Sequence, residues 1–472
     1  MVSLPRLVVA ATRSGDGKTT VATGIMAALR ARGLAVSPHK AGPDYIDPGY
    51  HAAACGVPGR NLDPWLTGED LVAPLLAHGA AGLHADVAVI EGVMGLFDGA
   101  AGRGDYASTA HVARLTGSPV ILVVDAAGTS VSVAATVHGF AGWDRRVRLA
   151  GIVLNRVASA RHEALLREAL APSGIPVVGA LARDPSLHTP SRHLGLVPAG
   201  ERPIETRAWL PGLRALVERG LDLDLLMRIA RGAPGLPAEP WSPAAAVADA
   251  AGTAGAGGPA ADRPPTGRPP VVAVASGPAF TFGYAEHAEL LAVAGASVVP
   301  FDPLTDRALP EGTDAVIAGG GFPEVHADAL AANTALLDDV RRRAAGGMPV
   351  VAECAGLLWL GESLDGRKQC GVVAARARMT GRLTLGYREA VALRDSPLVA
   401  AGTPVRAHEF HRTVSDPAHA GDPAWRLADG TETGWAAPGL LASYLHLHWA
   451  GLPGVAARLV RAALARRVAA PR

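Results

Sequence analysis

The sequence predicts an α/β protein of two successive domains, each built on a largely parallel sheet. Short apolar runs of strand length alternate with amphipathic helical patterns, which is typical of strand–helix–strand units. A glycine-rich loop separates the first apolar run from the first helical pattern. A stretch of alanine, glycine and proline interrupts the alternation before it resumes. We therefore place a first domain at 1–232, a linker at 233–269 and a second domain at 270–472.

Composition excludes several classes of function. The chain has 472 residues, 49% of them hydrophobic, and a net charge of +1, so large cores can form and a dedicated nucleic-acid binder is not expected. Three scattered cysteines and no Cys-x-x-Cys pair argue against a disulfide framework or a zinc site. No apolar run is long enough to span a membrane, and no secretory signal precedes the first strand. We expect a cytoplasmic protein without membrane partners.

The first apolar run, 7–11, is followed by a loop suited to phosphate binding. Its glycines permit a tight turn whose N–H groups point inward at the start of the next helix. Lys18 would neutralise β- and γ-phosphate oxygens, and the Thr19 hydroxyl would bind Mg²⁺. A plain glycine turn is the alternative, because Thr12 replaces the first glycine of the usual P-loop pattern. The predicted ATP-binding residues are Thr12, Ser14, Gly15, Asp16, Gly17, Lys18, Thr19 and Thr20.

Acidic residues follow the next two predicted strands. Asp44 and Asp47 lie in a proline- and glycine-containing loop after the strand that ends at Lys40, where open α/β sheets place ligands. They could hold Mg²⁺ or position a substrate; turn-forming aspartates are the alternative. Glu91 ends the strand at 86–91, where a P-loop fold has its second metal-binding acid, whereas Asp98 precedes Gly99 as an ordinary turn pair.

Further strands are predicted at 119–125, 148–157 and 176–181, which completes a parallel sheet with helices on both faces. Asn155, at a strand end, can hydrogen-bond an adenine edge, as the corresponding residue does in related folds. The loop Thr12-x-Ser14-Gly15-x-Gly17-Lys18-Thr19 resembles that of dethiobiotin synthetase and of the partition-type ATPases. Those two groups do different work, so the loop alone leaves the function open.

The second domain contains an apolar strand that delivers a cysteine into a turn of small residues. The strand at 349–353 precedes Cys354, and a helical pattern follows, as in a nucleophile elbow. A cysteine at a helix N-terminus has a lowered pKa, which favours nucleophilic catalysis; a buried structural cysteine is the alternative. We assign that structural role to Cys370. Upstream, Phe280, Phe282 and Tyr284 line either a pocket or a half-buried surface.

A base for this nucleophile is predicted near the C-terminus. A strand over 441–449 would place Tyr444, His446 and His448 on one face. A histidine pair at this spacing could instead bind a metal. The string Ala407-His408-Glu409-Phe410-His411 keeps that alternative open.

Three motifs of the second domain together resemble a class I glutamine amidotransferase, a flavodoxin-like α/β domain. They are Gly-Gly-Gly-Phe-Pro-Glu at 319–324, Glu-Cys-Ala-Gly at 353–356 and Ser-Tyr-Leu-His at 443–446. Joined to the P-loop and to Lys-Ala-Gly-Pro-Asp-Tyr-Ile-Asp-Pro at 40–48, they make the whole chain, apart from the linker, similar to the cobyrinic or hydrogenobyrinic acid a,c-diamide synthases.

The resemblance implies an amidoligase of cobalamin biosynthesis that acts on a corrinoid, with ATP and L-glutamine as co-substrates. ATP would activate a carboxylate as an acyl phosphate, with Thr19, Asp44 and Glu91 around Mg²⁺. Asp47 and Tyr45 would position the substrate or the phosphoryl group. Cys354 would attack glutamine, with His446 as acid–base and Gly320, Gly321 and Ala355 as the oxyanion hole. A homodimer is left open.

One departure from the family concerns the histidine. Most such amidotransferases carry His-Pro-Glu, whereas this chain has His446-Leu447-His448 without an acid at the third position. The site would be a Cys–His dyad, or Glu409 would orient the base from a neighbouring strand. Tyr-x-His favours His446 over His448.

Rival functions are the same chemistry on nickel-sirohydrochlorin, amidation of other side chains as in cobyric acid synthase, and a partition-type ATPase scaffold whose amidotransferase domain is inactive. The intact elbow counts against the scaffold.

Overall fold

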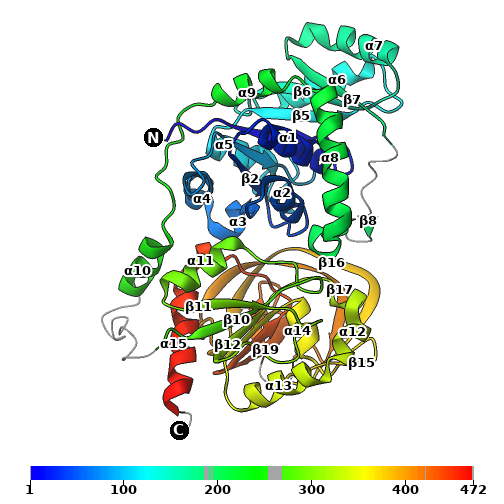
Figure 1. The fold of residues 1–472 in the computed structure, drawn as a ribbon. Helices are drawn as coiled ribbons and strands as arrows, with labels where there is room; N and C mark the ends of the chain where they lie inside the picture. The colour runs from blue at the N-terminus through cyan, green and yellow to red at the C-terminus, as the bar shows by residue number, and fades with distance from the viewer. Residues whose placement is uncertain are drawn as a thin grey trace. The chain divides into compact units, whose positions relative to one another are not determined.

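The chain divides into two compact units, Met1–Trp241 and Ser242–Arg472, each with its own main sheet (Figure 1). The computed structural model describes residues 2–184, 191–192, 195–253, 268–419, 421 and 423–469. In both units, parallel strands carry the predicted functional segments at their carboxyl ends. The predicted α/β fold class is therefore confirmed.

Unit 1 contains a seven-stranded sheet in the order β3-β2-β4-β1-β5-β6-β7, and all its pairings are parallel. Central strand β1 is buried along its whole length, which explains its continuous apolar sequence. The strands are β1 (Arg6–Ala11), β2 (Val36–Ala41), β3 (Arg60–Leu62), β4 (Val87–Glu91), β5 (Val120–Asp125), β6 (Leu149–Val157) and β7 (Val177–Ala182).

Helices cover both faces of this sheet (Figure 1). Helix α1 packs against β1 and β2 and is itself covered by α8. Two short strands, β8 (Ser191–Arg192) and β9 (Gly195–Leu196), form a separate antiparallel pair. The helices are α1 (Lys18–Ala31), α2 (Asp47–Cys55), α3 (Pro64–Thr67), α4 (Glu69–Ala81), α5 (Thr109–Thr116), α6 (Ser132–Trp143), α7 (Ala160–Leu170), α8 (Pro203–Gly220) and α9 (Leu223–Arg231).

Unit 2 contains a mixed sheet. From β11 through β10, β12 and β13 to β20 the pairings are parallel, and from β20 through β19 and β18 to β16 and β17 they are antiparallel. The strands are β10 (Val271–Ala275), β11 (Ser297–Phe301), β12 (Thr313–Ala318), β13 (Val350–Glu353), β14 (Ser363–Leu364), β15 (Arg367–Lys368), β16 (Arg376–Ala392), β17 (Pro404–Asp416), β18 (Pro423–Leu427), β19 (Glu432–Ala437) and β20 (Leu440–Ser443).

The structure differs from the predicted linker over part of its length. Residues Pro243–Thr253 form helix α10, which packs against α11 and α15 of unit 2. Alanine has the highest helix propensity, so an alanine-rich segment can form a helix without a strong apolar period. Residues 254–267 of the predicted linker lie outside the described residues. The other helices of unit 2 are α11 (Ala285–Val293), α12 (Ala327–Ala332), α13 (Thr334–Ala345), α14 (Ala355–Leu360) and α15 (Gly454–Ala469).

The aromatic run of unit 2 belongs to the core rather than to a surface. Phe280 packs edge-on against Trp359, and Phe282 packs edge-on against Phe322. Tyr284 lies 4.1 Å from the ring of His448, centroid to centroid. All three side chains of the run are buried.

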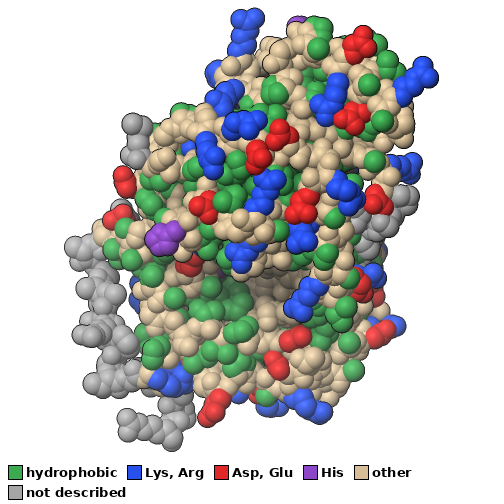
Figure 2. Space-filling model, turned by 45° about the horizontal axis from the view of Figure 1, so that its top comes forward, with side chains coloured by type: hydrophobic (Ala, Val, Ile, Leu, Met, Phe, Trp, Pro, Cys, Tyr) green, Lys and Arg blue, Asp and Glu red, His purple; other side chains and the backbone are tan. Residues whose placement is uncertain are grey.

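Acidic and basic side chains are interspersed over the face of the molecule shown in Figure 2, as the small net charge predicts. In the described part of the chain, none of the helices is long and apolar enough to cross a membrane.

Candidate functional site

The predicted P-loop connects β1 to α1 at the carboxyl edge of the first sheet. Gly15 and Gly17 have φ angles of 89° and 95°, which favour glycine. The Thr12 hydroxyl donates to the Asp16 carboxylate, which closes the loop on itself. Lys18 is buried, and its Nζ lies 3.4 Å from the carbonyl oxygen of Arg13, so its ammonium reaches across the loop. This is the arrangement predicted for a phosphate site.

A support for the loop comes from β6 and was not predicted. The Asn155 amide nitrogen donates to the carbonyl oxygen of Asp16 at 2.8 Å, and a Cβ at Gly17 would lie 2.3 Å from that nitrogen. Arg156 bridges the carbonyl oxygen of Gly15 and the carboxylate of Asp125. Asn155 thus holds the loop through its amide nitrogen, and the contact with adenine predicted from the sequence stays a prediction. The position of Arg156 and Asp125 at strand ends was the only feature of the sequence that could have indicated their role in supporting the loop.

The predicted acidic residues converge on Thr19. Its hydroxyl lies 2.6 Å from Glu91 Oε1 and 3.2 Å from Asp47 Oδ2. Between the two carboxylates lies Lys40 Nζ, at 2.6 Å from Asp47 and 3.1 Å from Glu91, and it also donates to the carbonyl oxygen of Gly92. From the sequence, Lys40 was identified as a strand end and as the first residue of the 40–48 motif, without a role of its own. Its signal lay in composition: the chain has three lysines, and two of them lie in this site.

Glu91 has a second, fully buried partner. His51 Nε2 on α2 lies 2.5 Å from Glu91 Oε2, and neither side chain is exposed. Burial alone would raise the pKa of Glu91, but Lys40, His51 and Thr19 together hold it well below its usual range. Glu91 therefore stays ionised, with its two oxygens fixed in direction. His51 was not identified from the sequence, because a histidine inside a helix carries no distinguishing pattern.

The other acidic candidates differ in their surroundings. Asp44 Oδ1 accepts the N–H groups of Ile46 and Asp47, and Oδ2 lies 3.9 Å from Lys40 Nζ, at the border of the cluster. Asp47, not Asp44, is the aspartate that contacts Thr19. Tyr45, between these aspartates in sequence, is buried. Asp98 accepts the N–H of Gly95, which is the turn role expected for it.

The cluster has an excess of negative charge. Burial would lower the pKa of Lys40, but Asp47, Glu91 and Asp44 raise it above its ordinary value. Burial beside Asp44 and Glu91 raises the pKa of Asp47. Burial and the neighbouring Lys40 lower the pKa of Lys18. Three carboxylates share one close lysine, so an additional cation would be stabilised here.

In unit 2, Cys354 follows β13 and immediately precedes α14. Its φ of 50° and ψ of −99° are strained for a residue with a side chain, which is characteristic of a nucleophile elbow. Its N–H donates to the carbonyl oxygen of Ser443 on the neighbouring β20. The sequence-predicted strand–cysteine–helix geometry is therefore present.

The predicted low pKa of Cys354 is not what the structure shows. Burial raises the pKa of this thiol well above its ordinary value; Glu324, Glu409 and Glu353 add to the rise and only the Ala355 N–H opposes it. The Sγ lies 3.7 Å from the carbonyl oxygen of Phe410, as a thiol donor would. The prediction considered only the helix N-terminus, whereas desolvation dominates. Cys354 is protonated in this state and needs a base to become a nucleophile.

The predicted strand at 441–449 is shorter in the structure, and this corrects the expected geometry of its histidines. Strand β20 ends at Ser443, so His446 and His448 do not share a strand face. His446 Nδ1 lies 3.6 Å from Glu353 Oε2, and its backbone pairs with His408 of β17. His448 Nε2 instead lies 3.7 Å from Glu286 Oε2 on α11.

The glycine turn after β12 lies against His446. A Cβ at Gly320 would lie 2.5 Å from His446 Cε1, and one at Gly321 would lie 2.2 Å from the carbonyl oxygen of Ala279. The Gly320 carbonyl accepts the N–H of Phe282 at 3.1 Å. The turn thus brings Gly320, one of the predicted oxyanion-hole residues, beside the predicted base.

Gly320→Ala is expected to lower glutamine-dependent turnover at least tenfold, because the added methyl would displace the His446 ring. Activity with ammonium salt should persist. Gly283→Ala, where a Cβ would meet open space, is the matched control. Steady-state assays with each nitrogen source check this, and equal losses with both sources would contradict it.

The alternative metal site around His408, Glu409 and His411 is not supported. Glu409 contacts Arg388 at 2.8 Å and His411 at 3.0 Å, so its carboxylate pairs with groups other than His446. His411 stacks on Tyr444. Across the described ranges, none of the His, Cys, Asp and Glu groupings has the geometry of a metal site.

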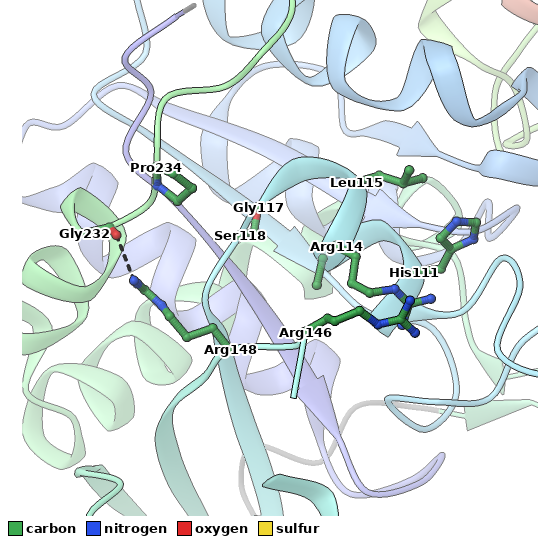
Figure 3. Close-up of a pocket in the computed structure, with 10 residues that line it drawn as sticks. His111, Arg114, Leu115, Gly117, Ser118, Arg146, Arg148, Gly232 and Pro234 are labelled. Carbon is green, nitrogen blue, oxygen red and sulfur yellow. Dashed lines mark hydrogen bonds between the residues drawn. The ribbon is translucent and has the colours of Figure 1, made fainter. Parts of the chain in front are cut away.

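A separate pocket of ≈780 Å³ opens near the C-terminal end of α5 and the start of β6 (Figure 3). Its arginines have partners: Arg114 pairs with Asp105 and Asp144, Arg146 pairs with Asp144, and Arg148 donates to the carbonyl oxygen of Gly232. It lies near the amino ends of β5 and β6, whereas the P-loop follows the carboxyl end of β1.

Comparison with known proteins finds one family match in each of the two units. Residues 7–197 match the CobQ/CobB/MinD/ParA nucleotide binding domain, and residues 271–453 match the CobB/CobQ-like glutamine amidotransferase domain. The first match contains the P-loop and its carboxylates. The second contains Cys354 and His446.

Relatives extend the similarity over nearly the whole chain. Hydrogenobyrinate a,c-diamide synthase of Streptomyces coelicolor is 56% identical, with 97% of each chain covered. The protein of that name from Mycobacterium bovis is 51% identical, with 96% of each chain covered. Cobyrinate a,c-diamide synthase of Gloeobacter violaceus is 44% identical, with 97% of each chain covered. With its nucleotide-binding and amidotransferase halves in this order, the chain belongs to the hydrogenobyrinate and cobyrinate a,c-diamide synthase family.

Proposed function

We propose that this protein uses ATP and L-glutamine to amidate the a and c carboxylates of hydrogenobyrinic acid. The observation that carries the proposal is the near-full-length similarity to hydrogenobyrinate a,c-diamide synthases, combined with a P-loop and a cysteine elbow in one chain. Carboxylates do not react with ammonia in water, so one half must activate the acid while the other supplies the nitrogen.

In the activating half, a substrate carboxylate oxygen attacks the γ-phosphorus of ATP and ADP leaves, which gives an acyl phosphate. Lys18 neutralises phosphate oxygens within the loop that Asn155 and Arg156 hold in place. Ammonia then attacks the acyl carbon and inorganic phosphate leaves. Repetition at the second carboxylate gives the diamide. Asp44, at the border of the carboxylate cluster, and its sequence neighbour Tyr45 are suited to substrate positioning.

Thr19, Glu91 and Asp47 are suited to the Mg²⁺ that accompanies ATP, because Mg²⁺ is usually held by one or two carboxylates together with substrate phosphates rather than by an all-protein cage. The hydroxyl of Thr19 and the carboxylates of Glu91 and Asp47 converge as hard donors, with Asp44 alongside. Mg²⁺ would neutralise charge on the phosphates. The ionised Glu91, fixed by His51, and the close contact of Asp47 with Thr19 make these two the main carboxylate donors.

In the glutaminase half, His446 takes the Cys354 thiol proton, and the thiolate attacks the side-chain amide carbon of glutamine. N–H groups of the 320–321 turn and of Ala355 would hold the oxyanion. His446 then gives its proton to the leaving nitrogen, so ammonia departs and a thioester remains. Water hydrolyses the thioester to glutamate and restores the thiol.

Cobyrinic acid is a second candidate substrate, because two relatives named cobyrinate a,c-diamide synthase are 44% and 40% identical to this chain. Higher identity to the hydrogenobyrinate enzymes favours the metal-free ring.

The test incubates the protein with Mg-ATP, glutamine and, separately, hydrogenobyrinic acid, cobyrinic acid and nickel-sirohydrochlorin, and follows each ring by mass spectrometry. Two successive acid-to-amide conversions on hydrogenobyrinic acid are expected. Conversion of cobyrinic acid alone would select the second candidate. ATP hydrolysis without a product from any of the three rings would contradict both.

A further inference from the structure

In this chain the usual glutamate of the family does not follow His446. The structure places a different carboxylate, that of Glu353, beside this histidine. Glu353 is the last residue of β13 and lies directly before Cys354. Its Oε2 is 3.6 Å from His446 Nδ1, and both side chains are largely buried. Resting on the glutaminase function proposed above, we propose that Glu353 is the positioning residue of His446 and stabilises its protonated form during glutamine hydrolysis.

Backbone pairing fixes the two residues near one another. Glu353 is in parallel register with Ser443, and the Cys354 N–H donates to the Ser443 carbonyl oxygen at 2.8 Å. Three residues after Ser443, the His446 backbone is held by reciprocal hydrogen bonds with His408. The acid, the nucleophile and the base are thus all anchored around the end of the β13–β20 pair.

The Glu353 carboxylate is available for this role. Its Oε1 is buried and has no hydrogen-bond partner in the described residues. At 3.6 Å the contact with Nδ1 is an ion-pair distance, and a small rotation of the carboxylate would shorten it to a hydrogen bond. An acceptor at Nδ1 keeps the proton on that nitrogen, which leaves Nε2 to accept the proton of Cys354.

Two other glutamates near these histidines have different partners. Glu409, which the sequence suggested, pairs with Arg388 and His411. Glu286 faces His448 at 3.7 Å. Among the described residues, Glu353–His446 and Glu286–His448 are thus Glu–His pairs of nearly equal spacing, and the first includes the neighbour of Cys354.

Charge around His446 makes the effect of Glu353 measurable. His408 of β17 and His287 of α11 are electrostatic neighbours of His446. His448 lies two residues after His446 in the same segment. Burial lowers the pKa of His408 to about 3 and that of His287 well below its ordinary value, so both are neutral near pH 7. Glu324 and Glu409 face Cys354. The Glu353 carboxylate is in ion-pair range of His446, so its negative charge favours the imidazolium over the neutral ring.

The experiment measures glutaminase kcat/KM against pH in the full-length protein, with L-glutamine as the probe, for Glu353→Gln, Glu353→Ala and Glu286→Gln. Glu353→Gln should move the acidic limb to lower pH, because the imidazolium loses its negative neighbour. Glu353→Ala should lower kcat by about 10²-fold, within the range of general-base effects. Glu286→Gln, the matched control, should leave the pH limb in place. Ammonium-dependent amidation should persist in all three.

A second measurement uses iodoacetamide, whose rate of reaction with Cys354 reports the thiolate. That rate should fall in Glu353→Ala and less in Glu353→Gln. If Glu353→Gln fails to fold, Glu353→Ala, which also removes the negative charge, carries the same pH test. An unmoved pH limb with unchanged alkylation would overturn the proposal for Glu353. Glutamine-dependent activity surviving in Cys354→Ser would instead overturn the underlying glutaminase assignment, so the two failures are distinguishable.

Discussion

Lys18→Ala is expected to abolish amidation with glutamine and with ammonium salt alike, a loss of about 10³-fold or more, on the scale of removing a preorganised charge-stabilising donor. Lys18 is the buried ammonium of the P-loop, and activation of the carboxylate precedes use of either nitrogen source. Steady-state assays on the ring substrate with both nitrogen sources check the result. Normal turnover without Lys18 would refute the phosphate-loop assignment.

Two further variants sharpen this test. Lys368→Ala removes the third lysine, which is exposed on β15 in unit 2, and should leave amidation unchanged. Lys18→Arg keeps the charge but replaces a compact ammonium by a larger planar group, so it should also be severely impaired. In a chain that uses arginine for almost all its basic positions, retention of lysine at 18 and 40 agrees with a steric requirement in the site.

Much of the fold could be predicted because buried parallel strands appear in the sequence as short apolar runs. Strands β1, β4 and β5 are apolar apart from one charged residue at an end of each, since helices cover both sheet faces. Their carboxyl ends meet at one edge, which is why the loop after β1 and the acid at the end of β4 could be placed together. Helix α10 was missed because it lies in a segment whose composition alone suggested a linker.

The residues that sequence reasoning missed owe their roles to tertiary contacts. Lys40 on β2 and His51 on α2 both contact the buried Glu91 at the end of β4. These three residues are far apart in the sequence, so no local pattern reveals the contacts. The strand-end position of Asn155 did not reveal that its amide holds the P-loop backbone. The prediction that His446 and His448 share one face of a strand over 441–449 was wrong, because β20 ends at Ser443. Beyond that residue, His446 lies near Glu353 and His448 lies near Glu286.

Cys354→Ser is expected to remove glutamine-dependent amidation, again by about 10³-fold or more, while activity with ammonium salt is kept. The serine preserves the size and position of the side chain at the strained elbow, so the fold should survive, but a buried hydroxyl is a far weaker nucleophile than a thiol with a base. Assays with each nitrogen source separate the two halves of the enzyme.

Cys370→Ser is the matched control for that variant. Cys370 is also fully buried in unit 2, and burial raises the pKa of its thiol well above the ordinary value, but it lies outside the elbow. Its replacement should lower the melting temperature through an added buried hydroxyl and leave both activities in place. If Cys354→Ser instead lost activity with ammonium salt as well, Cys354 would be a structural residue. The raised pKa of its thiol would then reflect burial alone, without a catalytic role for the elbow.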